Sequence, residues 1–331
     1  MTKPWRRAVV AVAIVAVASA SWLYLQFNPL GGVGREELVN IPSGSSLSEI
    51  ASDLESAHII SSAFAFRIDL ALFGSLQVQS GYYQIPAGDS FSNIRTILSQ
   101  GPNTVDINVT PGLALWEVEQ DLNQAEGQTY AVTFMTLAND AAAASPWRPN
   151  HSLEGLIAPG NYIVAPGETP AMLLAAMQNG FTAEMSAAGL NPQTRRYGLS
   201  AYQILIAASI VEKEGYYEVN KPKVARVILN RLAINNGLQM DSTVLYALHR
   251  DGGTVTRAML ENPSPYNTYL HAGLTPTPIC TVSVQDIEAV LHAPPGAWRY
   301  FTLINKDGTM AFSNTFAQQL ANEALAARRG I

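Results

Sequence analysis

Two glutamates that follow an apolar segment are the residues of this sequence best suited to acid–base chemistry. Residues 207–215 read A-A-S-I-V-E-K-E-G, which places Glu212 and Glu214 at the end of the apolar run. Burial penalises the charged form of a carboxyl group and so raises its pKa. Such a group keeps a proton near neutral pH and can donate it to a leaving oxygen, as cleavage of a glycosidic bond requires. The alternative is that both carboxylates and Lys213 form a solvated helix end without a chemical role.

A helix is predicted to carry these two glutamates. Ser200 and Gln203 have the spacing of a capping box and can begin the helix, and Gly215 can end it. Positions i and i+2 are about 200° apart around a helix, so the two glutamates flank its apolar stripe on opposite sides. Periodicity therefore leaves open which of the two would do the chemistry.

The sequence around this helix predicts both helices and strands. A second helix is predicted over about 220–232, and a short third helix begins at Asp241 or Ser242. Residues 301–313 predict a hairpin, and residues 315–329 predict a C-terminal helix that ends in basic residues. These elements indicate an α+β fold.

The N-terminus contains an apolar segment long enough to cross a membrane. An uncharged run extends from Ala8 to about Gln26, and about 18 apolar residues can span a bilayer core as a helix. Basic residues precede this run, so we expect the N-terminus in the cytoplasm and the remainder outside. The predicted segments are a cytoplasmic tail at 1–7 and a transmembrane anchor at 8–30. A small-x-small site at 18–20 leaves a cleaved signal peptide as the alternative, although the apolar run continues beyond it.

An internal repeat follows the apolar segment. The pattern I-P-x-G-x-S-[LF]-S-x-I-x-x-x-L begins at Ile41 and again at Ile85, and a looser echo extends from Val109 to Leu122. In each copy a strand can end at the Pro-x-Gly turn, and the serine can cap the helix that follows. The repeat predicts a small α+β module over residues 31–105. Glycan binding and a purely structural role are both open for this module.

The composition argues against several classes of function. The net charge is −6, from 20 basic and 26 acidic residues, and no basic stripe indicates a nucleic-acid partner. The five histidines are scattered without an H-E-x-x-H motif, and the sequence has no Walker, G-x-G-x-x-G or G-x-S-x-G motif. We therefore expect neither a metal nor another cofactor. The single cysteine, Cys280, cannot form an intrachain disulfide and is expected to be a small buried residue.

Five ordered blocks give this sequence a resemblance to a known family. The blocks are A-S-I-V-E-K-E at 208–214, K-V-A at 223–225, V-I-L-N-R-L at 227–232, L-Q-M-D-S-T-V-L-Y at 238–246 and S-P-Y-N-T-Y at 264–269. In this order and spacing they resemble the YceG-like family, and the resemblance extends over essentially the whole chain. It implies a membrane anchor, a LysM-like module over 31–105 and a larger mixed α+β catalytic domain over 106–331.

The resemblance also implies an activity, that of an endolytic lytic transglycosylase of peptidoglycan. Such an enzyme cleaves the bond between N-acetylmuramic acid (MurNAc) and N-acetylglucosamine (GlcNAc) in nascent strands and leaves 1,6-anhydro-MurNAc ends. In the family the second glutamate of E-K-E is the catalytic acid/base, which is Glu214 here. The implied partners are peptidoglycan glycan strands and membrane glycan synthases. The implied location is the cell membrane, with a single pass and an extracytoplasmic catalytic domain.

Residues near Glu214 are candidates for binding the glycan, because amides, hydroxyls and aromatic faces suit sugars. For Glu212 the alternative role is to tune charge or orient the helix, for Asp241 it is helix capping, and for Tyr266 it is core packing. The predicted substrate-binding residues are Glu212, Gln239, Asp241, Tyr266, Asn267 and Thr268.

The sequence departs from the family pattern in a proline-rich loop. Residues 273–283 read G-L-T-P-T-P-I-C-T-V-S, without the second glycine and the N-P-G end that the family usually has. The family's E-G-x-x-x-P-d-T-Y segment corresponds to residues 154–162, where Gly160 replaces the usual acidic residue before T-Y, and Ala311 stands where the family often carries histidine. These changes concern the subsites and leave Glu214 in place. Two other functions are therefore kept as alternatives, a muramidase-type hydrolase and a non-catalytic peptidoglycan-binding membrane protein.

Overall fold

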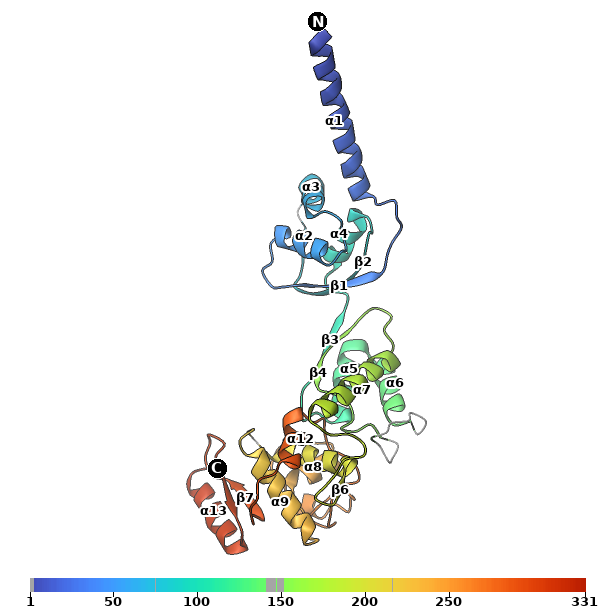
Figure 1. Cartoon of the computed structure of the whole chain (residues 1–331). Coiled ribbons are helices and arrows are strands. Elements are labelled where there is room, and N and C mark those ends of the chain that lie inside the picture. The colour runs from blue at the N-terminus through green and yellow to red at the C-terminus, as the bar shows by residue number, and fades with distance from the viewer. Residues whose placement is uncertain (1–2, 75, 141–146, 148–151, 216) are drawn as a thin grey trace. The chain divides into compact units, whose positions relative to one another are not determined.

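The computed structural model describes residues 3–74, 76–140, 147, 152–215 and 217–331 (Figure 1). The chain divides into two units. The first contains Met1–Asp106 together with Ile163–Glu168, and the second contains Ile107–Tyr162 together with Thr169–Ile331. Both units mix helices with short strands, so the expected α+β class is confirmed.

The N-terminal apolar segment forms one long helix, α1 (Lys3–Phe27). Its portion Trp5–Phe27 has a mean hydropathy of 2.2 and is long and apolar enough to cross a membrane. At 1.5 Å per residue, these residues extend about 35 Å, slightly more than the hydrocarbon core of a bilayer. A membrane anchor and a signal sequence both fit this helix.

The first unit is built from the two sequence repeats. Strand β1 (Glu36–Ile41) pairs antiparallel with β2 (Gly81–Pro86), with Glu36 opposite Pro86 and Ile41 opposite Gly81. Each strand is followed by a turn and a helix whose N-cap is the repeated serine. Ser46 caps α2 (Leu47–Ser56) and Ser90 caps α4 (Phe91–Gln100), as the repeat predicted.

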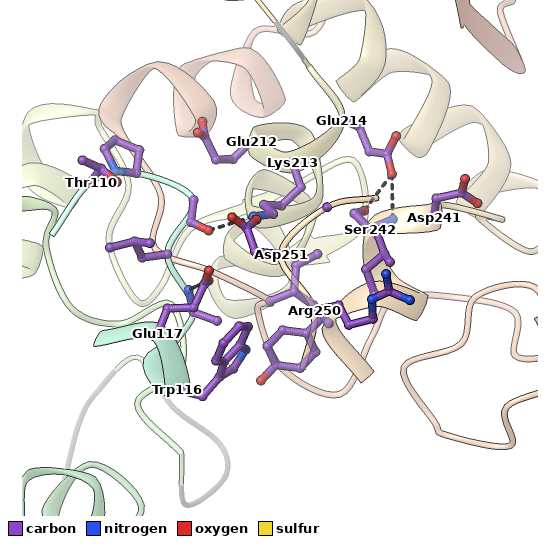
Figure 2. A pocket seen from close by; sticks show the side chains of 18 residues that line it. Thr110, Trp116, Glu117, Glu212, Lys213, Glu214, Asp241, Ser242, Arg250 and Asp251 are labelled. Atoms are coloured by element: carbon purple, nitrogen blue, oxygen red, sulfur yellow. Dashed lines mark hydrogen bonds and ion pairs between the residues drawn. The ribbon is translucent and has the colours of Figure 1, made fainter. Parts of the chain in front are cut away.

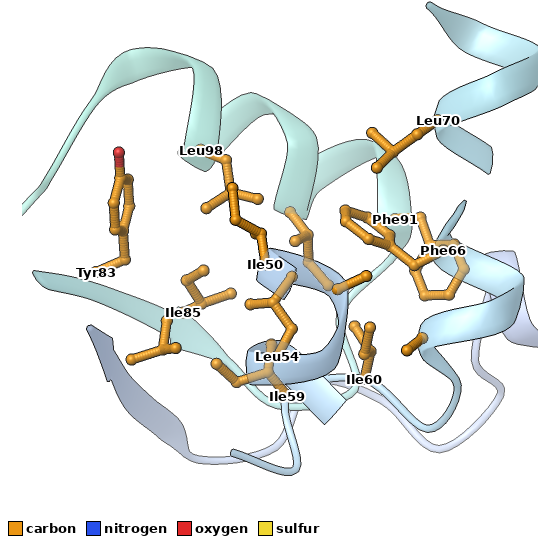
Figure 3. Packing of buried hydrophobic residues seen from close by; sticks show 14 of the residues in the cluster. Ile50, Leu54, Ile59, Ile60, Phe66, Leu70, Tyr83, Ile85, Phe91 and Leu98 are labelled. Atoms are coloured by element: carbon orange, nitrogen blue, oxygen red, sulfur yellow. The ribbon is translucent and has the colours of Figure 1, made fainter. Parts of the chain in front are cut away.

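A single hydrophobic core holds the first unit together (Figure 3). The repeated apolar positions of α2 and α4 are buried in it, except Leu47, which is partly buried and packs against it. Tyr83 of β2 and Phe66 of α3 (Ala63–Phe73) are also buried in this core. This core explains why the repeat recurs, because both copies supply equivalent side chains to the same interior. The LysM-like assignment of this module stays a prediction.

The second unit contains most of the helices, and two of the three remaining strand pairs of the described residues lie wholly within it. The pairs are β3 (Val105–Val109) with β4 (Gly160–Val164), β5 (Arg195–Arg196) with β6 (Leu199–Ser200), and β7 (Tyr300–Leu303) with β8 (Met310–Ser313). The helices are α5 (Leu115–Glu126), α6 (Gln128–Ala138), α7 (Pro170–Ala187), α8 (Ala201–Glu214), α9 (Lys221–Ala233), α10 (Asp241–Ala247), α11 (Arg257–Leu260), α12 (Val284–Leu291) and α13 (Phe316–Arg328). The predicted hairpin and C-terminal helix are therefore confirmed as β7–β8 and α13.

Helix α8 is the central element of the second unit. It begins at the predicted capping box of Ser200 and Gln203, and it packs against α9 and α12. Every residue from Ala201 to Val211 except Gln203 is buried, so the helix is apolar on nearly all sides. Its two glutamates follow at the point where α8 leaves the core.

A buried lysine joins α8 to its two neighbours. Lys221 of α9 is 6% exposed, and its Nζ lies 2.7 Å from Glu212 Oε2 of α8 and 2.8 Å from Asp286 Oδ1 of α12. Gly215, directly after α8, makes room for this lysine. A Cβ at Gly215 would lie 2.5 Å from Lys221 Cγ, so a larger residue would displace the lysine from its partners.

We predict that Lys221→Met destabilises the second unit severely. The substitution keeps most of the side-chain volume but leaves the buried Asp286 and the partly buried Glu212 without their cation. Breaking a buried pair in this way costs about 3–5 kcal/mol. Thermal unfolding of the full chain in detergent measures the loss. Lys306→Met, at an exposed position in the β7–β8 turn, is the matched control and is expected to stay close to the unmodified protein. Equal melting curves for the two variants would contradict the structural role of Lys221.

Candidate active site

A cleft of about 450 Å³ opens at the C-terminal end of α8 (Figure 2). One wall is the turn between β3 and α5, residues 110–117. The other wall is α10 with the loop at residues 250–252. The turn belongs to the looser third copy of the sequence repeat, which here again forms a strand, a turn and a helix.

Glu214 lies in this cleft as the last residue of α8. Its Oε1 accepts hydrogen bonds from the backbone N–H of Ser242 (3.2 Å) and from Ser242 Oγ (2.7 Å). Ser242 lies in the first turn of α10. The N–H groups of a first turn have no acceptor within the helix, so they stabilise a negative charge placed beside them. Burial raises the pKa of Glu214, and the two bonds from Ser242 oppose that rise.

Glu212 lines the same cleft but is bound on another side of the helix end (Figure 2). Burial raises its pKa to about 7, and the charge of Asp286 adds to the rise, while Lys221 opposes it. The pKa of Lys221 is itself raised, because its hydrogen bonds to Asp286, Glu212 and Glu218 outweigh the effect of burial. Glu212 is therefore held as part of the ionic contact that joins the helices.

Asp241 is the other predicted residue that lines the cleft. Tyr269 donates a hydrogen bond from its hydroxyl to Asp241 Oδ1 at 2.7 Å. Gln239 is exposed but does not line the cleft, and its backbone has a left-handed φ of 50°. Its N–H donates to the carbonyl of Thr268 at 3.1 Å, which fixes the chain just before α10.

The residues predicted around Tyr266 lie behind the cleft. Asn267 is 0% exposed and Thr268 is 2% exposed. Asn267 Nδ2 donates to the carbonyls of Leu260 (2.9 Å) and Asn262 (2.8 Å), which closes its own loop. Both side chains are enclosed and hydrogen-bonded within the protein, and neither lines the cleft.

Thr268 and Tyr266 instead support residues of the cleft wall. Thr268 Oγ1 accepts from the N–H of Met240 at 3.0 Å, directly before α10. The Tyr266 hydroxyl lies 2.9 Å from Thr277 Oγ1, and its ring centroid lies 4.9 Å from that of Tyr246, which lines the cleft. The Y-N-T-Y segment thus supports the cleft wall through contacts with Met240 and Tyr246 and does not line the cleft itself.

The structure adds cleft residues that sequence reasoning did not select. Trp116 lines the cleft and stacks on His249, with ring centroids 5.7 Å apart and planes 12° apart. Lys213 Nζ lies 3.1 Å from the carbonyl of Gly112 and 3.1 Å from Asp251 Oδ1, so it connects the two walls. The third copy of the repeat was the available signal for the wall that contains Trp116. Nothing in the sequence indicated that this copy faces Glu214.

Comparison with known proteins places the chain in a family. The family model described as the YceG-like family matches residues 39–324. The chain belongs to the YceG-like family.

Relatives of this YceG-like chain extend over most of its length. An endolytic murein transglycosylase of Bacillus subtilis (strain 168) is 29% identical over 297 residues, which are 85% of this chain and 82% of the relative. An endolytic murein transglycosylase of Streptococcus pneumoniae is 25% identical over 312 residues, 83% of this chain and 56% of the relative. The crystal structure of a YceG-like protein from Listeria monocytogenes matches with a TM-score of 0.60 and 25% identity. That match covers 87% of this chain and 99% of the Listeria chain.

A further buried carboxyl supports the cleft of this YceG-like chain. Glu154 is 4% exposed, and its side chain accepts from the N–H of Leu115 (3.1 Å to Oε1) and from the Tyr246 hydroxyl (2.9 Å to Oε2). Leu115 begins α5 and Tyr246 belongs to α10, so Glu154 connects the two walls beneath the cavity. Burial raises its pKa to about 7 against these hydrogen bonds.

We predict that Glu154→Gln changes how stability depends on pH. In the folded protein Glu154 has a pKa of about 7, above the ordinary value of 4.5. The unfolded chain therefore releases this proton at lower pH than the folded chain, and stability falls as pH rises from about 4.5 to about 7. Glutamine carries no such proton, so the variant should gain stability relative to the parent as pH rises, by up to about 3 kcal/mol.

Melting temperatures of parent and variant at pH 5 and pH 8 measure this difference, with exposed Glu261→Gln as control. A constant difference between parent and Glu154→Gln over this interval would contradict the raised pKa of Glu154.

Proposed function

We propose that this chain is an endolytic lytic transglycosylase that cleaves the MurNAc–GlcNAc bond of peptidoglycan strands and leaves 1,6-anhydro-MurNAc ends. Two relatives named endolytic murein transglycosylases, which match over most of this chain, support the murein substrate and the reaction class. The observation that carries the proposal is the position of Glu214, a carboxyl group in a cleft with one oxygen fixed by Ser242 and the other facing no partner within the described residues.

The other carboxylates of the cleft are each bound to a protein group. Glu117 Oε2 accepts from the N–H of Ala114 at 2.8 Å, and Glu212 is paired with Lys221. Asp241 accepts from Tyr269, and Asp251 is paired with Lys213. Such an arrangement suits a mechanism with one acid/base residue better than the two unhindered carboxylates that most glycosidases place on either side of the bond.

Glu214 first acts as general acid. Both of its hydrogen bonds fall on Oε1, so the proton is carried on Oε2. Burial keeps this proton in place near neutral pH, because it raises the pKa of the carboxyl group. Donation to the glycosidic oxygen lets the GlcNAc leave as positive charge develops on the MurNAc ring.

Glu214 then acts as general base. The carboxylate left after donation is stabilised by Ser242 and by the N-terminus of α10, and it accepts the proton of the MurNAc 6-hydroxyl. That hydroxyl attacks the anomeric carbon of the same sugar and closes the 1,6-anhydro ring. Because the nucleophile belongs to the substrate, orientation replaces a second catalytic carboxylate and a bound water.

The cleft walls supply groups suited to holding sugars. We assign Trp116, whose ring is fixed by stacking on His249, as an apolar platform, and Asp241 and Arg250 as hydrogen-bonding groups. Thr268 becomes a positioning residue that holds the start of α10, and therefore Ser242, in place. Asn267 fixes the loop that carries Thr268.

The proposed location is the cell membrane, with α1 as a single-pass anchor. The basic residues Arg6 and Arg7 precede the most apolar part of the helix and favour a cytoplasmic N-terminus. The second unit then lies outside the cytoplasm, where nascent glycan strands are made. Membrane glycan synthases are the proposed neighbours in that compartment.

We predict that Glu214→Gln abolishes formation of anhydro ends. Glutamine preserves the shape of the side chain but cannot donate or accept the catalytic proton, so activity should fall at least about 100-fold. Mass spectrometry of glycan strands incubated with the full chain in detergent identifies the ends. Glu212→Gln is the matched control, because it lies on the same helix and can still accept a hydrogen bond from Lys221.

The products separate the proposal from its alternatives. Reducing ends instead of anhydro ends would identify a muramidase-type hydrolase. Loss of cleavage in Glu212→Gln but not in Glu214→Gln would show that Glu212, and not Glu214, is the acid/base residue. Glycan binding without cleavage by the unmodified, folded protein would favour a wall-binding function.

We predict that Ser242→Ala shifts the pH dependence of the reaction. The Ser242 hydroxyl stabilises the carboxylate of Glu214, so its removal should raise the pKa of Glu214 further. The fall of kcat/KM on the alkaline side, where the acid loses its proton, should then move to higher pH. Ser242→Thr, which keeps a hydroxyl, should restore the original profile. A lower rate with an unchanged profile would show that Ser242 acts only through folding.

A further inference from the structure

Helix α3 of the first unit is apolar on both of its faces. Its inner face, which includes Phe66 and Leu70, is buried in the core of the unit. Its outer face has apolar residues at i, i+4, i+7 and i+8, namely Phe64, Ile68, Ala71 and Leu72. Phe64 is 62% exposed and Leu72 is 66% exposed. A surface helix in water normally has a polar outer face, so this pattern indicates a non-aqueous neighbour.

The charges of α3 are compatible with a lipid surface. Asp69 is 2% exposed, and its Oδ2 lies 3.1 Å from Arg95 Nε, so the only acidic residue of the helix is buried and paired. The exposed charge on α3 is the cation of Arg67, which donates to Ser48 Oγ at 3.1 Å. A basic residue beside an apolar stripe is attracted by anionic lipid headgroups.

Helix α3 contacts the candidate membrane span α1. Phe64 lines a cavity of about 370 Å³ together with α1 residues Ala18, Ser19, Trp22 and Leu23. At the end of α1 the ring of Phe27 lies 6.5 Å from that of Phe73 and 5.5 Å from that of Phe91, measured between centroids. The end of the span is thus packed on the first unit.

The position of Phe64 along α1 gives its depth in a bilayer. The α1 residues beside it lie four to nine positions before Phe27, or about 6–14 Å along the helix axis. Interfacial helices place their apolar face about 5–10 Å into the boundary between headgroups and acyl chains. If Phe27 marks the outer end of the apolar span, Phe64 reaches that depth.

We propose that the outer face of α3, Phe64, Ile68, Ala71 and Leu72, inserts into the outer leaflet of the membrane that α1 spans. The inference rests on the proposed anchoring by α1 and adds to it a second contact between the chain and the lipid. The first unit is then a membrane-docked module. If the first unit binds glycan, it must do so with surfaces other than the outer face of α3.

Site-specific fluorescence on the full chain tests this docking. Single cysteines at Phe64 and Leu72, in a Cys280→Ala background, are labelled with the environment-sensitive dye NBD. The labelled protein is reconstituted in vesicles of equal parts phosphatidylethanolamine and phosphatidylglycerol that contain spin-labelled lipid. Val15→Cys within α1 reports insertion of the span, and Ser99→Cys, exposed on α4, is the aqueous control.

We expect labels at positions 64, 72 and 15 to be quenched by the lipid spin label at least about twofold more than the label at 99. Quenching at 15 but not at 64 or 72 would overturn the docking of α3 and leave the anchoring intact. Absence of quenching at 15 would overturn the anchoring and the docking together. A blue-shifted but unquenched label at 72 would mean that protein, rather than lipid, covers this face, which also overturns the proposal.

A charge placed on the face provides a second measurement. Leu72→Glu adds an acidic group that anionic lipid repels, so quenching of the label at 64 should fall roughly twofold or more. Ser99→Glu, the matched exposed control, should leave that quenching unchanged. Equal quenching in both variants would contradict insertion of this face.

Discussion

The ammonium group of Lys221 is the constraint on which the second unit depends. It is buried between α8, α9 and α12, and it neutralises Glu212 and Asp286 within 2.8 Å. A buried cation of this kind adds less net stability than its short distances suggest, because removing three charges from water is costly. What it provides is position, because the pair of Glu212 with Lys221 ties the end of α8 to α9. Glu214, two residues further on, is aimed into the cleft as a consequence.

Burial raises the pKa of four glutamates in or beneath the cleft, Glu117, Glu154, Glu212 and Glu214. Carboxyl groups with raised pKa values are characteristic of sites where acid–base chemistry is done, but they have different surroundings here. Glu154 connects the two walls from below, and Glu212 is part of the ion cluster. Glu214 is held by one serine on one oxygen, which leaves the geometry of a proton donor. In the proposed mechanism burial keeps the proton on Glu214, whereas Glu117, Glu154 and Glu212 are each bound to other groups of the protein.

Much of the local structure could be predicted from the sequence. The serines at 46 and 90 cap the helices that the repeat predicted, and Ser200 and Gln203 form the expected capping box of α8. These predictions succeeded because a cap and its helix lie within a few residues of each other. The site was less accessible to such reasoning. Asn267 and Thr268 have the side chains of sugar-binding residues, yet both are enclosed. Asn267 is hydrogen-bonded within its own loop, and Thr268 is hydrogen-bonded to the residue before α10.

The sequence by itself determined the apolar N-terminal helix, the two repeats and the helix that carries Glu212 and Glu214, since hydrophobic period and capping act over short stretches of chain. Motif order identified the family, but periodicity could not choose between the two glutamates. Only the tertiary structure decided that Glu212 forms an ion pair with Lys221 and that Glu214 accepts hydrogen bonds from Ser242. It also brought Trp116, about a hundred residues upstream, into the cleft. These contacts join segments far apart in the chain, and their formation depends on packing that no local pattern encodes.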